Sequence, residues 1–168
     1  MTTFISALER DQLFFWRLDR RTYASTWDSG EGAFRVGGRW NRVGTRCVYC
    51  SIEPSTAILE VAVHVGFNAL NATPHVLTKA RITDPSALHV CSRADIPNAH
   101  WLIPGATSAG QQSFGDGLLA SHKFIAIPST VAPGSWNLIF VPSNASGSYV
   151  LEEQFPLALD PRLDPATL

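Results

Sequence analysis

The chain has 168 residues, of which 45% are hydrophobic and 16% charged, and its formal net charge is −1. This length fits one domain, which we predict over residues 1–168, and the apolar share is ordinary for a globular protein. The near-neutral charge argues against direct binding to nucleic acid, which usually needs a basic excess.

The predicted elements begin with a short helix over residues 3–12 and a buried strand over 13–18. A Gly-rich segment follows over 29–44, and we expect a long structured loop there with a short strand inside it. Further along the chain, strands are predicted over 46–51, 75–82, 88–91, 123–127, 137–141 and 149–155, and helices over 54–65 and near Leu118. Because strands outnumber helices without regular alternation, we predict an α+β fold with a mixed or antiparallel sheet.

The N-terminus and the cysteines bear on location. Charged residues Glu9, Arg10 and Asp11 interrupt the N-terminus before any apolar stretch long enough for a secretory signal, and no apolar run is long enough to cross a membrane. The cysteine count of 3 is small and odd, which suits a reducing compartment, so we expect a cytoplasmic protein. Cys47 and Cys50 have metal-type spacing, but strand alternation explains them better than a metal or redox role.

The helix over 54–65 carries the most informative side chain. Pro54 suits its first position and Gly66 its C-terminal stop, and its apolar residues form a wide face. Glu60 lies mid-helix between apolar neighbours, with His64 one turn further on. A carboxylate there is either part of a solvated polar stripe or faces a cleft, where it can meet developing positive charge.

The segment Gly37-Gly38-Arg39-Trp40-Asn41 has the composition of a ligand-binding loop. Two glycines let the backbone approach a ligand, and a guanidinium can bind a phosphate or a carboxylate in a bidentate way. Trp40 can pack or stack, and Asn41 can form hydrogen bonds. The alternative is a tight turn with a surface arginine.

The strand over 46–51 places Cys47, Tyr49 and Ser51 on one face by alternation, with Val48 and Cys50 on the other. Tyr49 is either part of the core or a platform for a flat heterocycle.

Ser129 and Asn137 lie next to the strands over 123–127 and 137–141. Ser129 fits turn chemistry, no nucleophile motif surrounds it, and Asn137 alone is ambiguous. The histidines of this chain lack metal-ligand spacing, and no phosphate-binding P-loop motif is present, so we expect no metal.

Taken together, these pieces resemble the RES domain, a family named for arginine, glutamate and serine. The resemblance runs from about residue 15 to 163 and rests on motifs in a fixed order: Trp16-Arg17, the segment from Gly32 to Asn41, Gly44, Tyr49, the Ala57 to Glu60 turn ending near His64, Gly115-Asp116, Pro128-Ser129, and Asn137 to Phe140 with Pro142. The segment from Val141 to Asn144 departs from the Asn-Pro-x-His that often ends this strand in the family.

The resemblance implies an ADP-ribosyltransferase-like fold of the diphtheria-toxin kind and a toxin that consumes NAD⁺. It also implies an Xre-type antitoxin as partner, one that blocks the active-site cleft. The catalytic residues would then be Arg39, Tyr49 and Glu60, with Glu60 near the anomeric carbon, Arg39 near the pyrophosphate and Tyr49 against the nicotinamide. Substrate contacts are expected from Ser129, Tyr23, Trp40, Asn41, Arg17 and Asn137.

Three functions remain open at this point. The first is cleavage of the nicotinamide–ribose bond of NAD⁺ with water or phosphate as acceptor. The second is transfer of ADP-ribose to a specific host protein, and the third is a non-catalytic binding module. Self-association is compatible with the low share of charged residues, but the sequence does not fix it.

Overall fold

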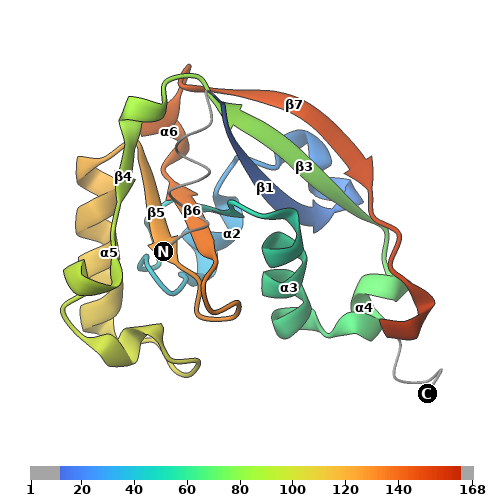
Figure 1. Cartoon of the computed structure of the whole chain (residues 1–168), viewed down its shortest axis with the longest axis horizontal. Coiled ribbons are helices and arrows are strands. Elements are labelled where there is room, and N and C mark those ends of the chain that lie inside the picture. Colours follow the sequence, from blue (N-terminus) through green and yellow to red (C-terminus); the bar gives the residue numbers. More distant parts are fainter. Residues whose placement is uncertain (1–11, 164–168) are drawn as a thin grey trace.

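The computed structural model describes residues 12–163, and the helix predicted over 3–12 falls outside them except for its last residue. Within the described part, seven strands form one sheet in the order β4-β5-β6-β2-β1-β3-β7. Neighbouring strands are antiparallel except β4 and β5, which run parallel. The predicted α+β fold with a mixed sheet is confirmed (Figure 1).

The strands agree with the predicted ones to within two residues at each end, except that the short strand expected inside 29–44 is reduced to an isolated bridge between Gly38 and Asn41. They are β1 Leu13–Arg20, β2 Val48–Ser51, β3 His75–Ile82, β4 Leu88–Val90, β5 Phe124–Pro128, β6 Trp136–Phe140 and β7 Tyr149–Pro156. The helix α3, Pro54–Val65, has the predicted bounds, and the helix near Leu118 is α5, Ala109–Ser121. Three short helices were not predicted: α2 Glu31–Val36, α4 Phe67–Ala72 and α6 Pro142–Ala145. Of the helices that the structure describes, none has the length and apolar character needed to traverse a bilayer.

The central strand β1 pairs extensively with one neighbour and hardly at all with the other. β1 pairs with β3 along its whole length, from Leu13 opposite Ile82 to Arg20 opposite His75. On its other side β1 meets β2 in a single register pair, Trp16 opposite Ser51. Because only this one register pair connects β1 to β2, the two strands diverge beside it. That divergence makes room for a cleft. In Figure 1, β1, β3 and β7 lean away from β5 and β6.

Three apolar clusters surround the sheet. The largest lies on one face and gathers aromatic rings of β1, β5 and β6, with Phe15, Phe124 and Phe140 fully buried. On the other face of β5, Ile125 and Ile127 pack under α5 with Leu119 and Trp40. The third cluster seats α3 and α4 against the β1 and β3 strands, beneath them in Figure 1. This last contact fixes α3 beside the opening in the sheet.

The three cysteines are free and buried. Cys47 packs in the cluster under α5 and Cys50 in the aromatic cluster, so their side chains lie on opposite faces of the sheet, as alternation predicted. Burial raises the pKa of Cys47 to about 12 and that of Cys91 to about 11, and it raises the pKa of Cys50 further still.

We therefore expect the thiols to be inert in the folded protein, because the thiolate is the reactive species. A chromogenic thiol reagent at pH 8 should label the native protein negligibly and should label all 3 cysteines after unfolding in guanidinium. Rapid labelling of the native protein would show that at least one thiol is accessible and ionised, contrary to its burial here.

Candidate active site

A cleft of about 760 Å³ opens where β1 and β2 separate. Its walls come from the middle of β1, the strand β2, one face of α3, the loop at 37–40, Asn137 of β6, and the segments around 104–107 and 128–131. Among the nine residues named as site candidates from sequence, six line this cleft. They are Arg17, Arg39, Trp40, Tyr49, Glu60 and Asn137.

Glu60 lies on α3, whose ends follow from the sequence: Pro54 occupies the first turn, and Gly66, at φ 81°, ends the helix in a conformation that favours glycine. Ala57 and Ala62 are buried, while Glu60 is partly exposed and faces the cleft. The carboxylate is anchored by one oxygen. Oε1 accepts hydrogen bonds from Ser129 Oγ and from Asn137 Nδ2, each 2.7 Å long.

The second oxygen of Glu60, Oε2, receives no hydrogen bond from the described residues. A carboxylate held through one oxygen keeps its orientation and leaves negative charge on the other for a cationic partner. Of the two interpretations of Glu60, the geometry therefore matches a carboxylate that faces a cleft.

Ser129 combines the turn role with contact to Glu60. Its side chain is almost fully buried, and its Oγ accepts hydrogen bonds from the backbone N–H groups of Val131 (3.1 Å) and Ala132 (2.9 Å). With its lone pairs used in this way, the hydroxyl proton is directed to Glu60. Ser129 thus contacts the Glu60 carboxylate but does not itself line the cleft.

Arg39 places a cation in the same cleft. Its guanidinium donates long hydrogen bonds to the backbone oxygens of Trp101 (3.3 Å) and Gly105 (3.4 Å). In residues 12–163 it forms no ion pair with a carboxylate. Weak neutral contacts hold the side chain in place without cancelling its charge, so an anionic ligand can bind there.

Tyr49 lines the cleft and also organises the Arg39 loop. Its hydroxyl donates to Asn41 Oδ1 (2.7 Å) and accepts from the Trp40 N–H (2.9 Å). Burial raises the pKa of Tyr49 well above its ordinary value, so the phenol stays neutral. Gly38 is required by this contact, since a Cβ there would lie 2.6 Å from the tyrosine hydroxyl oxygen.

Three residues expected to contact substrate lie elsewhere or point inward. Asn41 is completely buried, and its amide donates to the backbone oxygens of Ala33, Arg42 and Thr45, so it holds the loop together. The Trp40 side chain is 2% exposed and packs edge-on against Phe114, so little of it reaches the cleft. Tyr23 lies in the 3₁₀ helix Arg21–Thr26, is 57% exposed and does not line the cleft.

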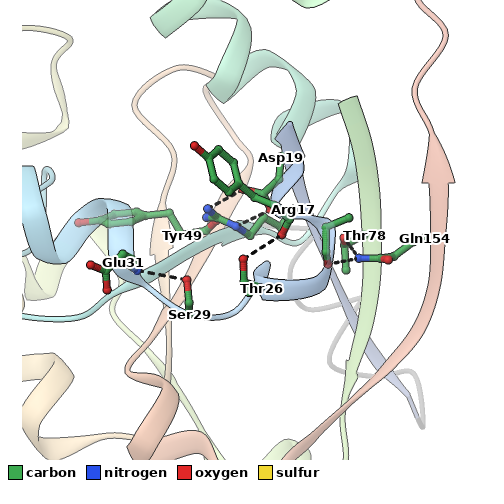
Figure 2. A network of polar contacts seen from close by, with 10 residues as sticks. Arg17, Asp19, Thr26, Ser29, Glu31, Tyr49, Thr78 and Gln154 are labelled. Carbon is green, nitrogen blue, oxygen red and sulfur yellow. Dashed lines mark hydrogen bonds and ion pairs between the residues drawn. The ribbon is translucent and has the colours of Figure 1, made fainter. Parts of the chain in front are cut away.

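Arg17 lines the cleft and takes part in the network of polar contacts drawn in Figure 2. Its guanidinium donates two bonds of 2.8 Å to Asp19 and one of 2.7 Å to the backbone oxygen of Tyr49. Burial opposes the charge on Arg17, while its surroundings, first among them the charge and hydrogen bonds of Asp19, raise the pKa of the guanidinium. Arg17 therefore joins β1 to β2 where their backbone pairing has ended. Asp19 was missed from the sequence, although its i+2 spacing places it on the same strand face as Arg17.

Ser51 is a second polar residue that the sequence did not single out as functional. Its hydroxyl donates to Asn137 Oδ1 at 3.0 Å, behind the contact of that amide with Glu60. Alternation had placed Ser51 on the same face as Tyr49, which was the available signal. Its pairing with Asn137, 86 positions away, was not encoded in any local pattern.

Comparison with known proteins agrees with this arrangement. A family model described as the RES domain matches residues 14–160. A protein named Toxin Res from Yersinia enterocolitica is 34% identical over 148 residues, which cover 86% of this chain and 94% of the relative. A protein named Prs ADP-ribosylating toxin from a Sphingobium species is 33% identical over 138 residues, which cover 77% of this chain and 83% of the relative.

The fold is shared with a chain of the crystal structure of the MbcT–MbcA toxin–antitoxin complex of M. tuberculosis. The TM-score is 0.69, the sequence identity is 18%, and the match covers 91% of each chain. With the family model matching nearly all of the described residues and relatives above 30% identity along most of their length, this chain belongs to the RES family.

Proposed function

We propose that this chain is the toxin of a bacterial toxin–antitoxin pair and that it cleaves the nicotinamide–ribose bond of NAD⁺, with water or phosphate as acceptor. It is an enzyme of the NAD⁺-consuming kind, and its substrate pool is cytoplasmic NAD⁺. The observation that carries the proposal is the Glu60 carboxylate, which faces the cleft and is anchored through Oε1 alone. Membership in the RES family and the toxin names of the relatives support it.

Cleavage of this bond requires negative charge close to the ribose carbon that is attacked. When the bond between ribose C1′ and the nicotinamide nitrogen breaks, both electrons leave with neutral nicotinamide and the ribose gains oxocarbenium character. A fixed carboxylate close to C1′ stabilises that charge more in the transition state than in the ground state. The oxygen of water or phosphate then bonds to C1′, and when water is the acceptor it loses one proton to the solvent.

The remaining residues suit the rest of the nucleotide. The cleft volume of about 760 Å³ is within the range of roughly 300–1,000 Å³ common for small-molecule sites. Arg39 supplies a cation for the pyrophosphate, and the ring of Tyr49 offers a wall for the nicotinamide. Asn137 and Ser129 act on Glu60 by hydrogen bonding.

The direct test is release of free nicotinamide from NAD⁺ by the pure protein, measured by chromatography with and without inorganic phosphate. The proposal expects release, and the second product identifies the acceptor: ADP-ribose for water, or ADP-ribose phosphorylated at the same ribose carbon for phosphate. No release from protein shown by mass spectrometry to be free of a bound antitoxin would overturn it.

Transfer of ADP-ribose to a protein is the second candidate, because a relative at 33% identity is named an ADP-ribosylating toxin. The chemistry is shared up to the acceptor. Incubation with labelled NAD⁺ and a bacterial lysate should give a discrete labelled band if this candidate is right, and only soluble labelled products if it is wrong.

The antitoxin is the expected protein partner, and we propose the Xre type for it. The shared fold with a chain of a toxin–antitoxin complex supports an antitoxin partner. Copurification with the protein encoded next to this gene, with loss of nicotinamide release in the complex, tests the assignment.

Replacing Arg39 with methionine is expected to weaken NAD⁺ binding. A charged hydrogen bond is worth about 1.5–3 kcal/mol, so kcat/KM should fall by about 10- to 100-fold, mainly through KM. The matched control is Arg42→Met, since Arg42 is exposed and its hydrogen bonds to the described residues all use its backbone atoms. If steady-state kinetics give the two variants equal KM values, the cation at Arg39 does not bind the substrate.

A further inference from the structure

Four polar side chains are linked by hydrogen bonds beside the cleft, and three of them, Ser51, Asn137 and Glu60, line it. Ser51 Oγ donates to Asn137 Oδ1 at 3.0 Å, Asn137 Nδ2 donates to Glu60 Oε1 at 2.7 Å, and Ser129 Oγ donates to the same Oε1 at 2.7 Å. We propose that Ser51 is a positioning residue, which fixes the orientation of the Asn137 amide and through it the Glu60 carboxylate. Its role in turnover rests on the proposed function, whereas its effect on the amide does not.

The proposal follows from the two ends of an asparagine amide. One end is an acceptor and the other a donor, and only the donor end can stabilise the Glu60 carboxylate. When the amide is rotated by half a turn, Oδ1 faces the carboxylate and the two oxygens repel each other. A hydroxyl that donates to Oδ1 on the far side stabilises the productive orientation and leaves the NH₂ group for Glu60.

Ser51 is placed to do this without strain. Its side chain is 2% exposed, so water does not replace its hydrogen bond readily. Its backbone is held by register pairs on both sides, with Asn137 in β6 and with Trp16 in β1. The hydroxyl therefore belongs to a strand residue that is paired on both sides, where β2 connects the two halves of the sheet. Its position does not depend on a loop.

Glu60 Oε1 is therefore held from two sides, by Ser129 and by Asn137. Ser129 is fixed by two backbone N–H groups, so its hydroxyl approaches Oε1 from the turn after β5. Asn137 approaches the same oxygen from β6, and among the described residues the sole hydrogen-bond donor to its Oδ1 is Ser51. Loss of the Ser51 hydroxyl removes this donor from Oδ1 and weakens one of the two hydrogen bonds that orient the carboxylate.

The test uses a pair of variants with the same shape. Ser51→Thr and Ser51→Val add the same bulk, but only threonine keeps the hydroxyl. With NAD⁺ as substrate, the valine variant should have a kcat about tenfold below that of the threonine variant, while KM stays within about twofold. Ser51→Ala should behave as valine does. Ser135→Ala is the control, because the Ser135 hydroxyl bonds to Thr56 and not to the Glu60 group.

A second measurement does not need turnover. In the wild-type protein the side-chain NH₂ protons of Asn137 should give resolved NMR signals that exchange slowly with water. In Ser51→Val and Ser51→Ala the exchange should be about tenfold faster, and in Ser51→Thr and Ser135→Ala it should be unchanged. If the wild-type protein releases no nicotinamide, the proposed function fails, yet this exchange still decides the role of Ser51.

Equal kcat and equal exchange in the threonine and valine variants would overturn the proposal. The same conclusion follows if Ser135→Ala loses as much kcat as Ser51→Val, because the effect would then be a general loss of packing. A kcat that falls in valine and is restored in threonine, together with the matching change in exchange, supports it.

Discussion

Replacing Glu60 with glutamine is expected to lower the rate of nicotinamide release by about 10²- to 10³-fold, the loss typical when one electrostatic group that stabilises a transition state is removed. Glutamine keeps the size of the side chain and loses its charge. Because Ser129 and Asn137 both donate to Oε1, the amide oxygen of the variant should take the place of Oε1. The amide NH₂ then occupies the position of Oε2 and faces the cleft, where it repels the forming ribosyl cation.

The same geometry predicts that the variant stays folded. The two hydrogen bonds to Oε1 survive, and Glu60 is only partly buried, so the free energy of unfolding should change by less than about 1 kcal/mol. Glu53→Gln is the matched control. Glu53 lies at the N-cap of the same helix and makes no side-chain capping bond, so its variant should keep full activity.

Single-turnover kinetics with saturating NAD⁺ and urea unfolding of all three proteins provide the measurement. Turnover by Glu60→Gln within threefold of the wild type would remove Glu60 from the catalytic role. It would also favour a non-catalytic binding function if the toxic effect in cells persisted. A loss of activity accompanied by unfolding would contradict the expected geometry of the amide.

The parts of the fold that were predicted well carry their signals locally. The helix α3 has a proline at its start and a glycine at its end, and both bounds were predicted. The faces of β2 followed from simple alternation. The helix α2 was missed because its six residues lie between Gly30 at φ 63° and Gly37 at φ 74° inside a Gly-rich segment. So short a helix depends on its surroundings, here including the ion pair between Glu31 and Arg46.

The candidate site was only partly accessible to the same reasoning. The resemblance named Glu60, Ser129 and Asn137, but their meeting joins positions 69 and 77 residues apart, and no periodicity specifies that. Asn41 and Trp40 fitted a ligand-binding loop by composition, yet the structure turns both side chains inward. An irregular loop has no period that tells which side chains face the protein and which face a ligand.

The inward direction of that loop depends on Gly115 of α5. A Cβ at this position would lie 2.0 Å from the backbone oxygen of Trp40 and 2.6 Å from its carbonyl carbon. Neighbouring positions on the same helix face hold the loop as well. Gln112 donates to the backbone oxygen of Gly38 at 2.9 Å, and Asp116 accepts from the Arg42 N–H at 3.2 Å. The loop that carries Arg39 is therefore seated on α5 by contacts that need the helix to approach closely.

Gly115→Ala is accordingly expected to destabilise the protein by about 3 kcal/mol, the upper end of the usual cost of overpacking, because a backbone atom rather than a flexible side chain stands in the way. The shift of the loop should also move Arg39 and raise KM for NAD⁺.

Gly117→Ala is the matched control on the same helix. It meets nothing within 4 Å, so the better helix propensity of alanine should stabilise the protein by about 0.5–1 kcal/mol. Urea unfolding measures both values. Because the two substitutions have the same intrinsic helix preference, any difference between them reports the contact with Trp40. If Gly115→Ala were as stable as Gly117→Ala, the loop would be free to move away from α5, and the position of Arg39 in the cleft would not be fixed by the fold.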